Sequence, residues 1–531
     1  MEEQSVTKGF AILSIAGILG KILSLLYIPI LRYILKDEGY GIYTAAYQIY
    51  AFMFVLTNAG IPVAISKLIS ELTATDRHKD AIRAFKLARI MLLLLGSIMA
   101  FFMIILARPL ANITQYSRAY IAVVALAPSI LFTSVASAYR GYFQGRANMI
   151  PTAVSQVIEQ ILNTIFSLVC AALLIKYGLE LGCAGGTIGT SIGALFSALF
   201  LLNYYNRNKK IKYNKIKERK YSNRQLIRKI IQYGLPITLC VGMNYAGNIV
   251  DLYNTKSRLM VGGFTNSQAT ILYGFLGKYQ QLINVPIAII TSLSAAILPA
   301  ISGAVVNGDK KAVKSNINYA FRLCFLIAIP SAVGLRVLSR PVYEMLKLGR
   351  GYDIMGYGAL VLVFMAIAQI QTTILQSIGK LNIATIYSLI GIICKIAVNY
   401  FLIAIPSINI KGAIYGSIVG FLVPIILNHR IIKKTLRVKF NLLKPMVKPL
   451  ISAEIMGVVV FAVFKGIHML LSLVNKGYIT NFLATVVAIL AGILFYGFAL
   501  ALTGGLNKED LNKLPNKFVR LIPNFIKKRL K

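Results

Sequence analysis

Long apolar stretches, separated by short polar segments, run along the whole chain. A helix that crosses a membrane needs about 20 mainly apolar residues, and it tolerates interruption by Pro or Gly. Fourteen stretches fit, at about residues 9–35, 41–70, 89–107, 118–139, 150–176, 183–204, 229–255, 270–302, 317–338, 357–378, 383–404, 411–429, 447–471 and 480–503. Hydrophobic residues make up 57% of the chain, against about 45–50% in soluble domains. The pattern predicts an all-α polytopic membrane protein with about fourteen transmembrane helices.

The charge then indicates how the spans are oriented. The chain carries 57 Lys and Arg against 17 Asp and Glu, a net charge of +40. A soluble protein with this charge would suggest nucleic acid, but the loops of membrane proteins hold their basic residues on the cytoplasmic side, so we expect no nucleic-acid partner. With a cytoplasmic N-terminus, the inner segments hold 40 basic residues, the outer segments 12 and the spans five. We expect a multi-pass protein of the cell membrane with both termini cytoplasmic.

Short motifs recur in the same order in the two halves of the chain. "IPVAIS" (61–66) recurs as "LPAIS" (298–302), and "GRAN" (145–148) recurs as "GKLN" (379–382). A glycine series follows the same rule, with Gly185, Gly189 and Gly193 recurring as Gly412, Gly416 and Gly420. Offsets that drift by a few residues indicate a duplication with insertions. Each repeat holds six predicted helices. Because six is an even number, the two repeats are parallel and related by an axis along the membrane normal. Two parallel bundles of six helices are an architecture for alternating access, in which the lobes rock around a site between them.

The repeat predicts five parts along the chain. The stretch "NRNKKIKYNKIKERK" (206–220) between the halves has eight basic residues and one acid. We interpret it as a linker that sets topology, with a grip on anionic lipid headgroups as the alternative. The parts are an N-lobe at 1–205, a basic cytoplasmic linker at 206–228, a C-lobe at 229–430, two further spans within 431–503 and a basic cytoplasmic tail at 504–531.

Glycines at intervals of four residues make one smooth helix face against which another backbone packs closely. For the two glycine series we favour packing within a lobe over a functional hinge. Gly141 and Gly145, which precede Pro151, instead predict a tight elbow between the fourth and fifth spans, with Pro151 in the first turn of the next helix.

Ionisable groups inside the membrane are costly and therefore indicate function. They are the acids Glu159, Asp251 and Glu454 and the cations Lys21, Arg32, Lys278, Lys395 and Lys465. Polar residues concentrate in spans one, two, seven and eight, which are equivalent pairs in the two repeats. We predict a cavity between the lobes, lined by Lys21, Asn58, Asn248, Asp251, Arg258, Lys278 and Gln281. Its positive charge favours an anionic substrate. Internal pairing of these groups is the alternative, and Asp251 fits a structural partner for a nearby cation as well as a proton or ion carrier.

A second polar stripe begins after "YRGYFQGRANMIP" (139–151). Gln156 and Glu159 lie in the fifth span, and Arg140 precedes them on the adjacent helix. We expect a structural ion pair between Arg140 and Glu159. Arg140, Arg146, Gln156 and Glu159 together are the candidate cytoplasmic gate or interface. We interpret the two arginines as topology and interface anchors first, and as contacts for a substrate headgroup second.

Residue patterns typical of catalysis are absent from the sequence. His78, His429 and His468 are scattered, the five cysteines form no CxxC pair, and no ATP-binding Walker A loop occurs. We therefore expect no enzyme activity, no cofactor and no metal. Transport would be driven by an ion gradient, the membrane potential or the supply of substrate.

The motifs resemble those of a known family. "GIPVAISKLISE" (60–71), "YRGYFQGRANMIPTAVSQVIEQ" (139–160) and "NYAFRLCFLIAIPSAVGLRVLSRPV" (318–342) are similar to segments of the polysaccharide-export flippases. These belong to the multidrug/oligosaccharidyl-lipid/polysaccharide (MOP) superfamily, so the resemblance implies a MATE/MOP-like fold. The resemblance points to the branch of stage V sporulation protein B and the MurJ-type lipid II flippases of Gram-positive bacteria.

The resemblance implies a flippase for an undecaprenyl-pyrophosphate-linked precursor, such as lipid II or a related lipid-linked oligosaccharide, used for peptidoglycan, spore cortex or polysaccharide. It implies cavity cations that neutralise the pyrophosphate, and two extra C-terminal helices that help to hold the polyprenyl tail. The chain departs from the arginine-rich cavity of MurJ-type members. Lys21 stands where one such arginine would fall, and Tyr27 and Phe54 lie near the expected places of others; lysine lacks the bidentate fork of arginine.

Two other functions remain open on the sequence. One is a cation-coupled multidrug exporter of the same superfamily, which predicts a cluster of buried acids. The other is a non-catalytic envelope-assembly protein or a membrane enzyme, which predicts a soluble docking or catalytic domain. We expect the partners to be a lipid-linked anionic glycan and membrane lipids, and the protein to be a monomer.

Overall fold

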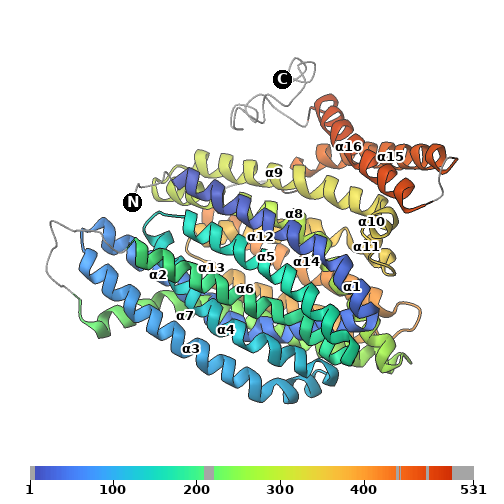
Figure 1. The fold of residues 1–531 in the computed structure, drawn as a ribbon. Coiled ribbons are helices and arrows are strands. Elements are labelled where there is room, and N and C mark those ends of the chain that lie inside the picture. Colours follow the sequence, from blue (N-terminus) through green and yellow to red (C-terminus); the bar gives the residue numbers. More distant parts are fainter. Residues whose placement is uncertain (1–5, 209–220, 438–441, 443, 474–476, 505–531) are drawn as a thin grey trace. The chain divides into compact units, whose positions relative to one another are not determined.

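Every regular element in the described part of the chain is a helix (Figure 1). The computed structural model describes residues 6–208, 221–437, 442, 444–473 and 477–504. The α-helices are α1 (Val6–Asn58), α2 (Ile61–Ala74), α3 (His78–Ile113), α4 (Tyr120–Gly145), α5 (Ile150–Leu174), α6 (Leu179–Arg207), α7 (Asn223–Val261), α8 (Asn266–Val306), α9 (Lys310–Val337), α10 (Ser339–Met345), α11 (Tyr352–Gly358), α12 (Val361–Ser377), α13 (Leu381–Leu402), α14 (Gly412–Leu436), α15 (Lys444–Ser472) and α16 (Tyr478–Leu502). Three 3-10 helices connect them, η1 (Ser117–Ala119), η2 (Ile175–Tyr177) and η3 (Asn409–Lys411).

Eleven helical stretches among the described residues are long and apolar enough to cross a membrane. They become twelve when α11 and α12, bent by 49° at their junction, form one span. The predicted count of fourteen is therefore not confirmed, although each predicted stretch falls largely on one helix or on two consecutive ones. The 53 residues of α1 would measure about 80 Å at ~1.5 Å per residue, more than twice the ~30 Å hydrocarbon core. Non-helical backbone at Lys36, with φ of 60°, divides α1 into two segments.

Close packing groups the chain into two units. Unit 1 holds Met1–Gly277 with Ser388–Gly416, and unit 2 holds Lys278–Tyr387 with Ser417–Lys531. In unit 1, α5 packs on α6, α4 packs on α3 and α6, and α1 and α2 pack on α7. In unit 2, α9 packs on α12 and α15, and α15 packs on α16.

The five predicted parts follow the sequence repeat rather than this packing, so their bounds stay a prediction. Most of the predicted linker, at 209–220, and nearly all of the predicted tail, at 505–531, lie outside the described residues.

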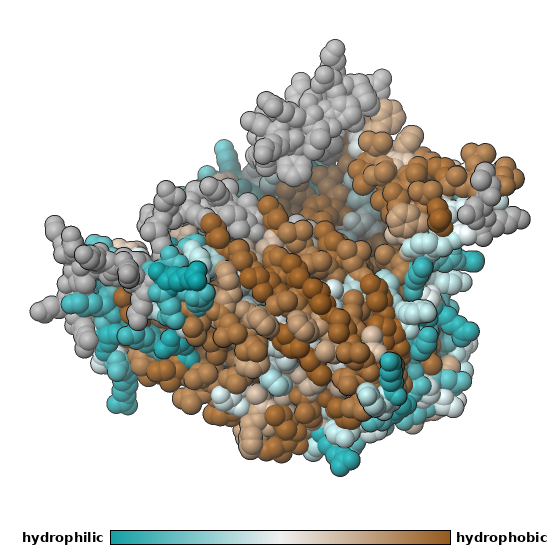
Figure 2. All heavy atoms as spheres, viewed as in Figure 1, coloured by the Kyte–Doolittle hydropathy of each residue, from teal (hydrophilic) through white to brown (hydrophobic). Residues whose placement is uncertain are grey.

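The helices of unit 1 expose large apolar side chains along their outer faces. Figure 2 shows hydrophobic residues over the face that α3, α5 and α6 form, with hydrophilic residues towards the helix ends. The exposed side chains include Ile90, Leu94, Phe101 and Ile105 on α3 and Ile161, Ile165, Val169 and Leu173 on α5. Water-soluble monomers rarely expose so continuous an apolar surface, whereas contact with lipid tails favours it. The surface therefore fits a membrane-spanning bundle.

The first glycine series forms the contact between α5 and α6. A Cβ atom at Gly185, Gly189 or Gly193 would lie only 2.4–2.5 Å from a backbone carbonyl oxygen of α5, that of Cys170, Asn163 or Glu159 respectively. Glycine is required because any side chain would separate the two helices. Packing within one unit, as predicted for this series, is confirmed.

Gly141 and Gly145 have the same role, and the elbow predicted at these glycines is wrong. Both lie inside α4 and face α2, where an added Cβ would come within 2.8 Å of the oxygen of Pro62 and 2.6 Å of that of Ser66. The chain turns after the glycines, at Ala147, which has φ of 54°. Pro151 lies in the first turn of α5, as predicted.

A methyl group at Gly189 tests this close packing. In Gly189→Ala the new Cβ meets the Asn163 carbonyl, so α5 and α6 must move apart at a cost of about 1–3 kcal/mol. We expect a lower midpoint of thermal unfolding in detergent. The matched control is Gly497→Ala in α16, where nothing lies within 4 Å of the new Cβ. Equal midpoints for the two variants would contradict close packing at Gly189.

Candidate functional site

The predicted cavity residues of α1 differ in their surroundings. Lys21 is exposed on the first segment of α1. Asn58 lies at the end of α1 and is fully engaged, because its Nδ2 donates to the oxygen of Phe54 at 3.2 Å and its Oδ1 accepts from Ser137 Oγ at 2.9 Å. Lys21 is therefore the more available of the two for an external ligand.

Asp251 has an internal partner. Its Oδ2 lies 2.7 Å from Lys395 Nζ, and its Oδ1 accepts a 2.6 Å hydrogen bond from Asn399 Nδ2. The carboxylate side chain is 15% exposed and the lysine 21%, so α7 and α13 share a largely buried ion pair. Of the two interpretations of Asp251, the structure shows the cation partner; a role as ion carrier stays a prediction.

The remaining predicted residues of α7 lie on either side of this pair. Asn248 is half-buried one turn before Asp251. Arg258 is bound near the end of α7, since its Nε donates to the oxygen of Tyr400 at 2.8 Å and its guanidinium lies 4.0 Å from the centre of the Tyr400 ring.

Lys278 is buried in unit 2, with 1% of its surface exposed. Its ammonium donates to the backbone oxygens of Leu348 at 2.8 Å and Arg350 at 3.3 Å, an arrangement that fits a structural role after α10. Gln281, half-buried one turn later, also belongs to unit 2. The other predicted cavity residues belong to unit 1, so the single shared cavity stays a prediction.

The ion pair expected at the start of α5 is confirmed. Arg140 Nη2 lies 2.6 Å from Glu159 Oε2, and the same guanidinium donates to Ser155 Oγ at 3.0 Å and Ser197 Oγ at 2.8 Å. This arginine therefore joins α4, α5 and α6. Arg146 donates to the Tyr142 hydroxyl at 2.9 Å, and Gln156 is half-buried on α5. Their role as a gate stays a prediction.

A row of tyrosines on the second segment of α1 forms a polar strip inside unit 1. The Tyr43 hydroxyl is hydrogen-bonded to that of Tyr27, and the Tyr47 hydroxyl to Thr190 of α6. Thr190 in turn donates to Asn163 of α5 at 3.2 Å. The sequence analysis missed this strip because it treated tyrosines within an apolar stretch as hydrophobic residues. The signal that could have revealed it is the recurrence of tyrosine at intervals of three and four residues, at positions 40, 43, 47 and 50.

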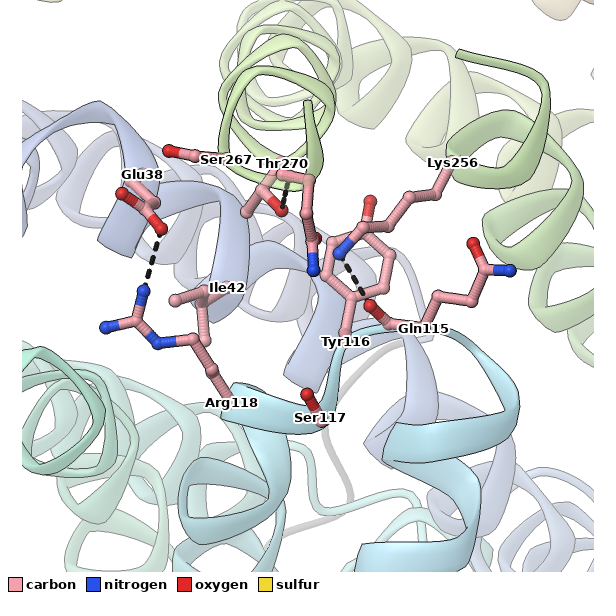
Figure 3. A pocket seen from close by; sticks show the side chains of 10 residues that line it. Glu38, Ile42, Gln115, Tyr116, Ser117, Arg118, Lys256, Ser267 and Thr270 are labelled. Carbon is pink, nitrogen blue, oxygen red and sulfur yellow. Dashed lines mark hydrogen bonds and ion pairs between the residues drawn. The ribbon is translucent and has the colours of Figure 1, made fainter. Parts of the chain in front are cut away.

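A pocket of about 210 Å³ lies where α3 and α7 end and α8 begins (Figure 3). Its lining comes from α1, the α3–η1 turn, η1, α7 and α8, and consists of Glu38, Ile42, Gln115, Tyr116, Ser117, Arg118, Lys256, Asn266, Ser267 and Thr270. Arg118 Nη1 lies 2.8 Å from Glu38 Oε1 on one side of the pocket. Lys256 reaches in from the other side, where its Nζ donates to the Gln115 oxygen at 2.6 Å.

The sequence pattern did not single out this pocket. Arg118 stands at the very start of the predicted stretch 118–139, and Lys256 lies one residue beyond the stretch 229–255, so neither was counted among the cations inside the spans. Only the fold brings α1, η1, α7 and α8 together here. Within the described ranges, no group of three His, Cys, Asp or Glu side chains is placed to hold a metal ion.

Comparisons with known proteins identify relatives along most of the chain. A family model described as polysaccharide biosynthesis protein matches residues 6–305. Stage V sporulation protein B of Bacillus subtilis is 27% identical over 453 residues, which cover 83% of this chain and 86% of that protein. The lipid II flippase MurJ of the same organism is 25% identical over 490 residues, which cover 85% and 87%.

Solved structures show the fold. The lipid II flippase MurJ in an inward closed conformation has a TM-score of 0.65 at 16% identity and covers 94% of this chain and 98% of that one. A multidrug resistance MATE transporter of the MOP superfamily, facing inward, also has a TM-score of 0.65 at 16% identity and covers 78% and 94%. The predicted all-helical MATE/MOP-like fold of a multi-pass membrane protein is confirmed.

The ion pair of Asp251 and Lys395 leads to a prediction about the unfolding midpoints of single and double variants. Removing one partner leaves a largely buried charge uncompensated, which costs about 3–5 kcal/mol, whereas replacing both partners is often nearly neutral. Asp251→Asn and Lys395→Met should each lower the unfolding midpoint in detergent clearly more than the double variant does. Additive losses in this double-mutant cycle would show that the two groups are not coupled.

Proposed function

Because the chain belongs to the polysaccharide biosynthesis protein family, we propose that it is a flippase for an undecaprenyl-pyrophosphate-linked cell-envelope precursor. The substrate would be lipid II or a related lipid-linked oligosaccharide, moved from the inner to the outer leaflet by alternating access. The family match over more than half of the chain is the observation that carries this proposal. It agrees with the resemblance that the sequence motifs suggested.

The named relatives support the substrate class. One is a lipid II flippase that matches 85% of this chain, and the other is a sporulation protein. Both fit a product destined for the cell wall or the spore cortex. A flippase moves its lipid without changing a covalent bond, so the proposal includes no catalytic residue.

The chemistry of the substrate fits the placement of Lys21. A pyrophosphate carries negative charge through the membrane and needs a cation that is not already neutralised. Lys21 is exposed, and no hydrogen bond or ion pair is found for it among the described residues. The polyprenyl tail would remain in lipid, and α15 and α16, which pack on each other, would help to hold it. An ion gradient or the membrane potential would drive the cycle.

The multidrug alternative has less support. An exporter of cationic drugs needs acids that are free to bind them, and two of the three acids predicted inside the spans are paired. Glu159 lies 2.6 Å from Arg140, and Asp251 lies 2.7 Å from Lys395. The inward-facing MATE structure is similar to this chain in fold alone, at 16% sequence identity, so it gives no support for a drug substrate.

Reconstitution in liposomes with a fluorescent lipid II tests the proposal. The wild-type chain should bring the labelled headgroup to the opposite leaflet. Lys21→Ala should slow the initial rate at least about tenfold, the equivalent of ~1.4 kcal/mol of lost interaction with the pyrophosphate. Lys86→Ala is the matched control, because Lys86 is also an exposed lysine, on α3, but it is not among the residues predicted to line the cavity.

Two outcomes would count against different parts of the proposal. No translocation of any lipid-linked glycan by the folded wild-type chain would refute the flippase function. Normal translocation by Lys21→Ala, with an unchanged unfolding midpoint, would refute only the assignment of Lys21.

A further inference from the structure

The pocket between α1, η1, α7 and α8 holds a buried cation without an acidic partner in hydrogen-bonding contact. Lys256 is 2% exposed. Its ammonium donates to one backbone oxygen, that of Gln115 at 2.6 Å, and lies 3.8 Å from the centre of the Tyr116 ring. An ammonium has three donors, and both of these neighbours are neutral. The site can therefore give at least one further hydrogen bond to a ligand.

The opposite side of the pocket provides an acceptor. Glu38 contacts Arg118 through Oε1 at 2.8 Å, and Arg118 also reaches Glu180 Oε1 at 3.3 Å. The second carboxylate oxygen of Glu38 has no hydrogen bond or ion pair among the described residues, so it can accept from a hydroxyl group. In Figure 3 this ion pair and Lys256 lie on opposite sides of Ile42 and Thr270.

A third group in the pocket lacks a partner. The hydroxyl of Tyr116 is buried and has no hydrogen-bond partner among the described residues, and the residue as a whole is 2% exposed. Buried hydroxyl groups are nearly always bonded, so such an exception calls for a ligand or a water. Tyr116 also contributes an aromatic wall, packed on the ring of Tyr273 with 5.6 Å between centres.

Size and composition limit the ligand. A volume of about 210 Å³ suits a small ligand on the scale of one six-membered ring with its hydroxyl groups. It is smaller than the ~300 Å³ at which sites for drug-sized molecules begin. The pocket offers hydrogen-bond donors from Lys256 and Tyr116, an acceptor from Glu38 and apolar surface from Ile42 and the Tyr116 ring. This lining suits a molecule with hydroxyl groups, which both donate and accept hydrogen bonds. A free anion such as phosphate would face the carboxylate of Glu38.

We propose that this pocket binds a single sugar ring of a glycan, with Lys256 and Tyr116 donating to ring or hydroxyl oxygens and Glu38 accepting from a hydroxyl. The inference rests on the proposed function for its source of sugar, the headgroup of the lipid-linked precursor. A ring bound here would contact α1 and η1 on one side and α7 and α8 on the other. Under the predicted orientation the pocket is on the outer side, where the headgroup would arrive.

Direct binding to the full-length protein in detergent tests the proposal without lipid transport. Saturation-transfer NMR with methyl glucoside or N-acetylglucosamine should show contact at millimolar sugar. Lys256→Met removes the ammonium but keeps the length of the side chain, and Tyr116→Phe removes one oxygen. Each should weaken binding about fivefold, the scale of one lost hydrogen bond. Lys67→Met is the matched control, because Lys67 also lies over a tyrosine ring, at 4.1 Å from the centre of Tyr233, away from this pocket.

The outcomes separate the sources of sugar and the two proposals. If a short-chain lipid-linked glycan competes with the sugar, the pocket is assigned to the headgroup of the precursor. If the glycan does not compete, the pocket is a site for free sugar, and the assignment to the precursor is overturned. Sugar binding that is equal in wild type, Lys256→Met and Tyr116→Phe would overturn the pocket. So would displacement of sugar by millimolar inorganic phosphate, which would show an anion site. Because no flipping is measured, these results do not depend on the test of the flippase.

Discussion

The polar groups that enter the spans of unit 1 must find partners inside the protein, because lipid tails offer none. Arg140 with Glu159 and Asp251 with Lys395 meet this requirement, at 2.6 and 2.7 Å. The first pair joins the consecutive helices α4 and α5, and the second joins α7 and α13, which are distant along the chain. Each pair restricts the rotation of its two helices as well as neutralising their charge. This pairing also decides which charges remain for a ligand: a cation without an acid in hydrogen-bonding contact, such as Lys21 or Lys256, is a better candidate than a paired one.

Glycine faces make such pairing possible. The backbone of α6 approaches α5 at Gly185, Gly189 and Gly193, and α4 approaches α2 at Gly141 and Gly145. At this spacing short side chains such as Ser197 and Ser155 lie close enough to share the guanidinium of Arg140. The motif at 139–151 thus provides both close helix packing and neutralisation of a charge. Its glycines and its buried Tyr139, Tyr142 and Phe143 pack the bundle, and its first arginine is neutralised there.

Under the proposed function, the pocket and the predicted cavity would serve the same transport cycle. A flippase must hold a charged headgroup and then release it. In the proposed cycle Lys21 would make an early contact with the pyrophosphate, and the pocket at Lys256 would hold a sugar ring. Both sites use lysine, a compact point charge, where arginine would bind phosphate more rigidly. Weaker binding would favour release of the substrate in the proposed cycle.

The sequence by itself determined the helical membrane fold, the family and the pair of Arg140 and Glu159. Apolar stretches of about 20 residues form helices in lipid whatever surrounds them, and residues on adjacent helices near one shared turn meet without further information. Only the tertiary structure decided the partner of Asp251, the burial of Lys278 and the pocket at Lys256. These features depend on contacts between residues far apart in the sequence. Lys256 and Gln115 are 141 positions apart, and Lys278 and Leu348 are 70 apart. Local periodicity says which face of a helix is polar, but the rotation and neighbours of that helix follow from packing, where glycine contacts set the distances.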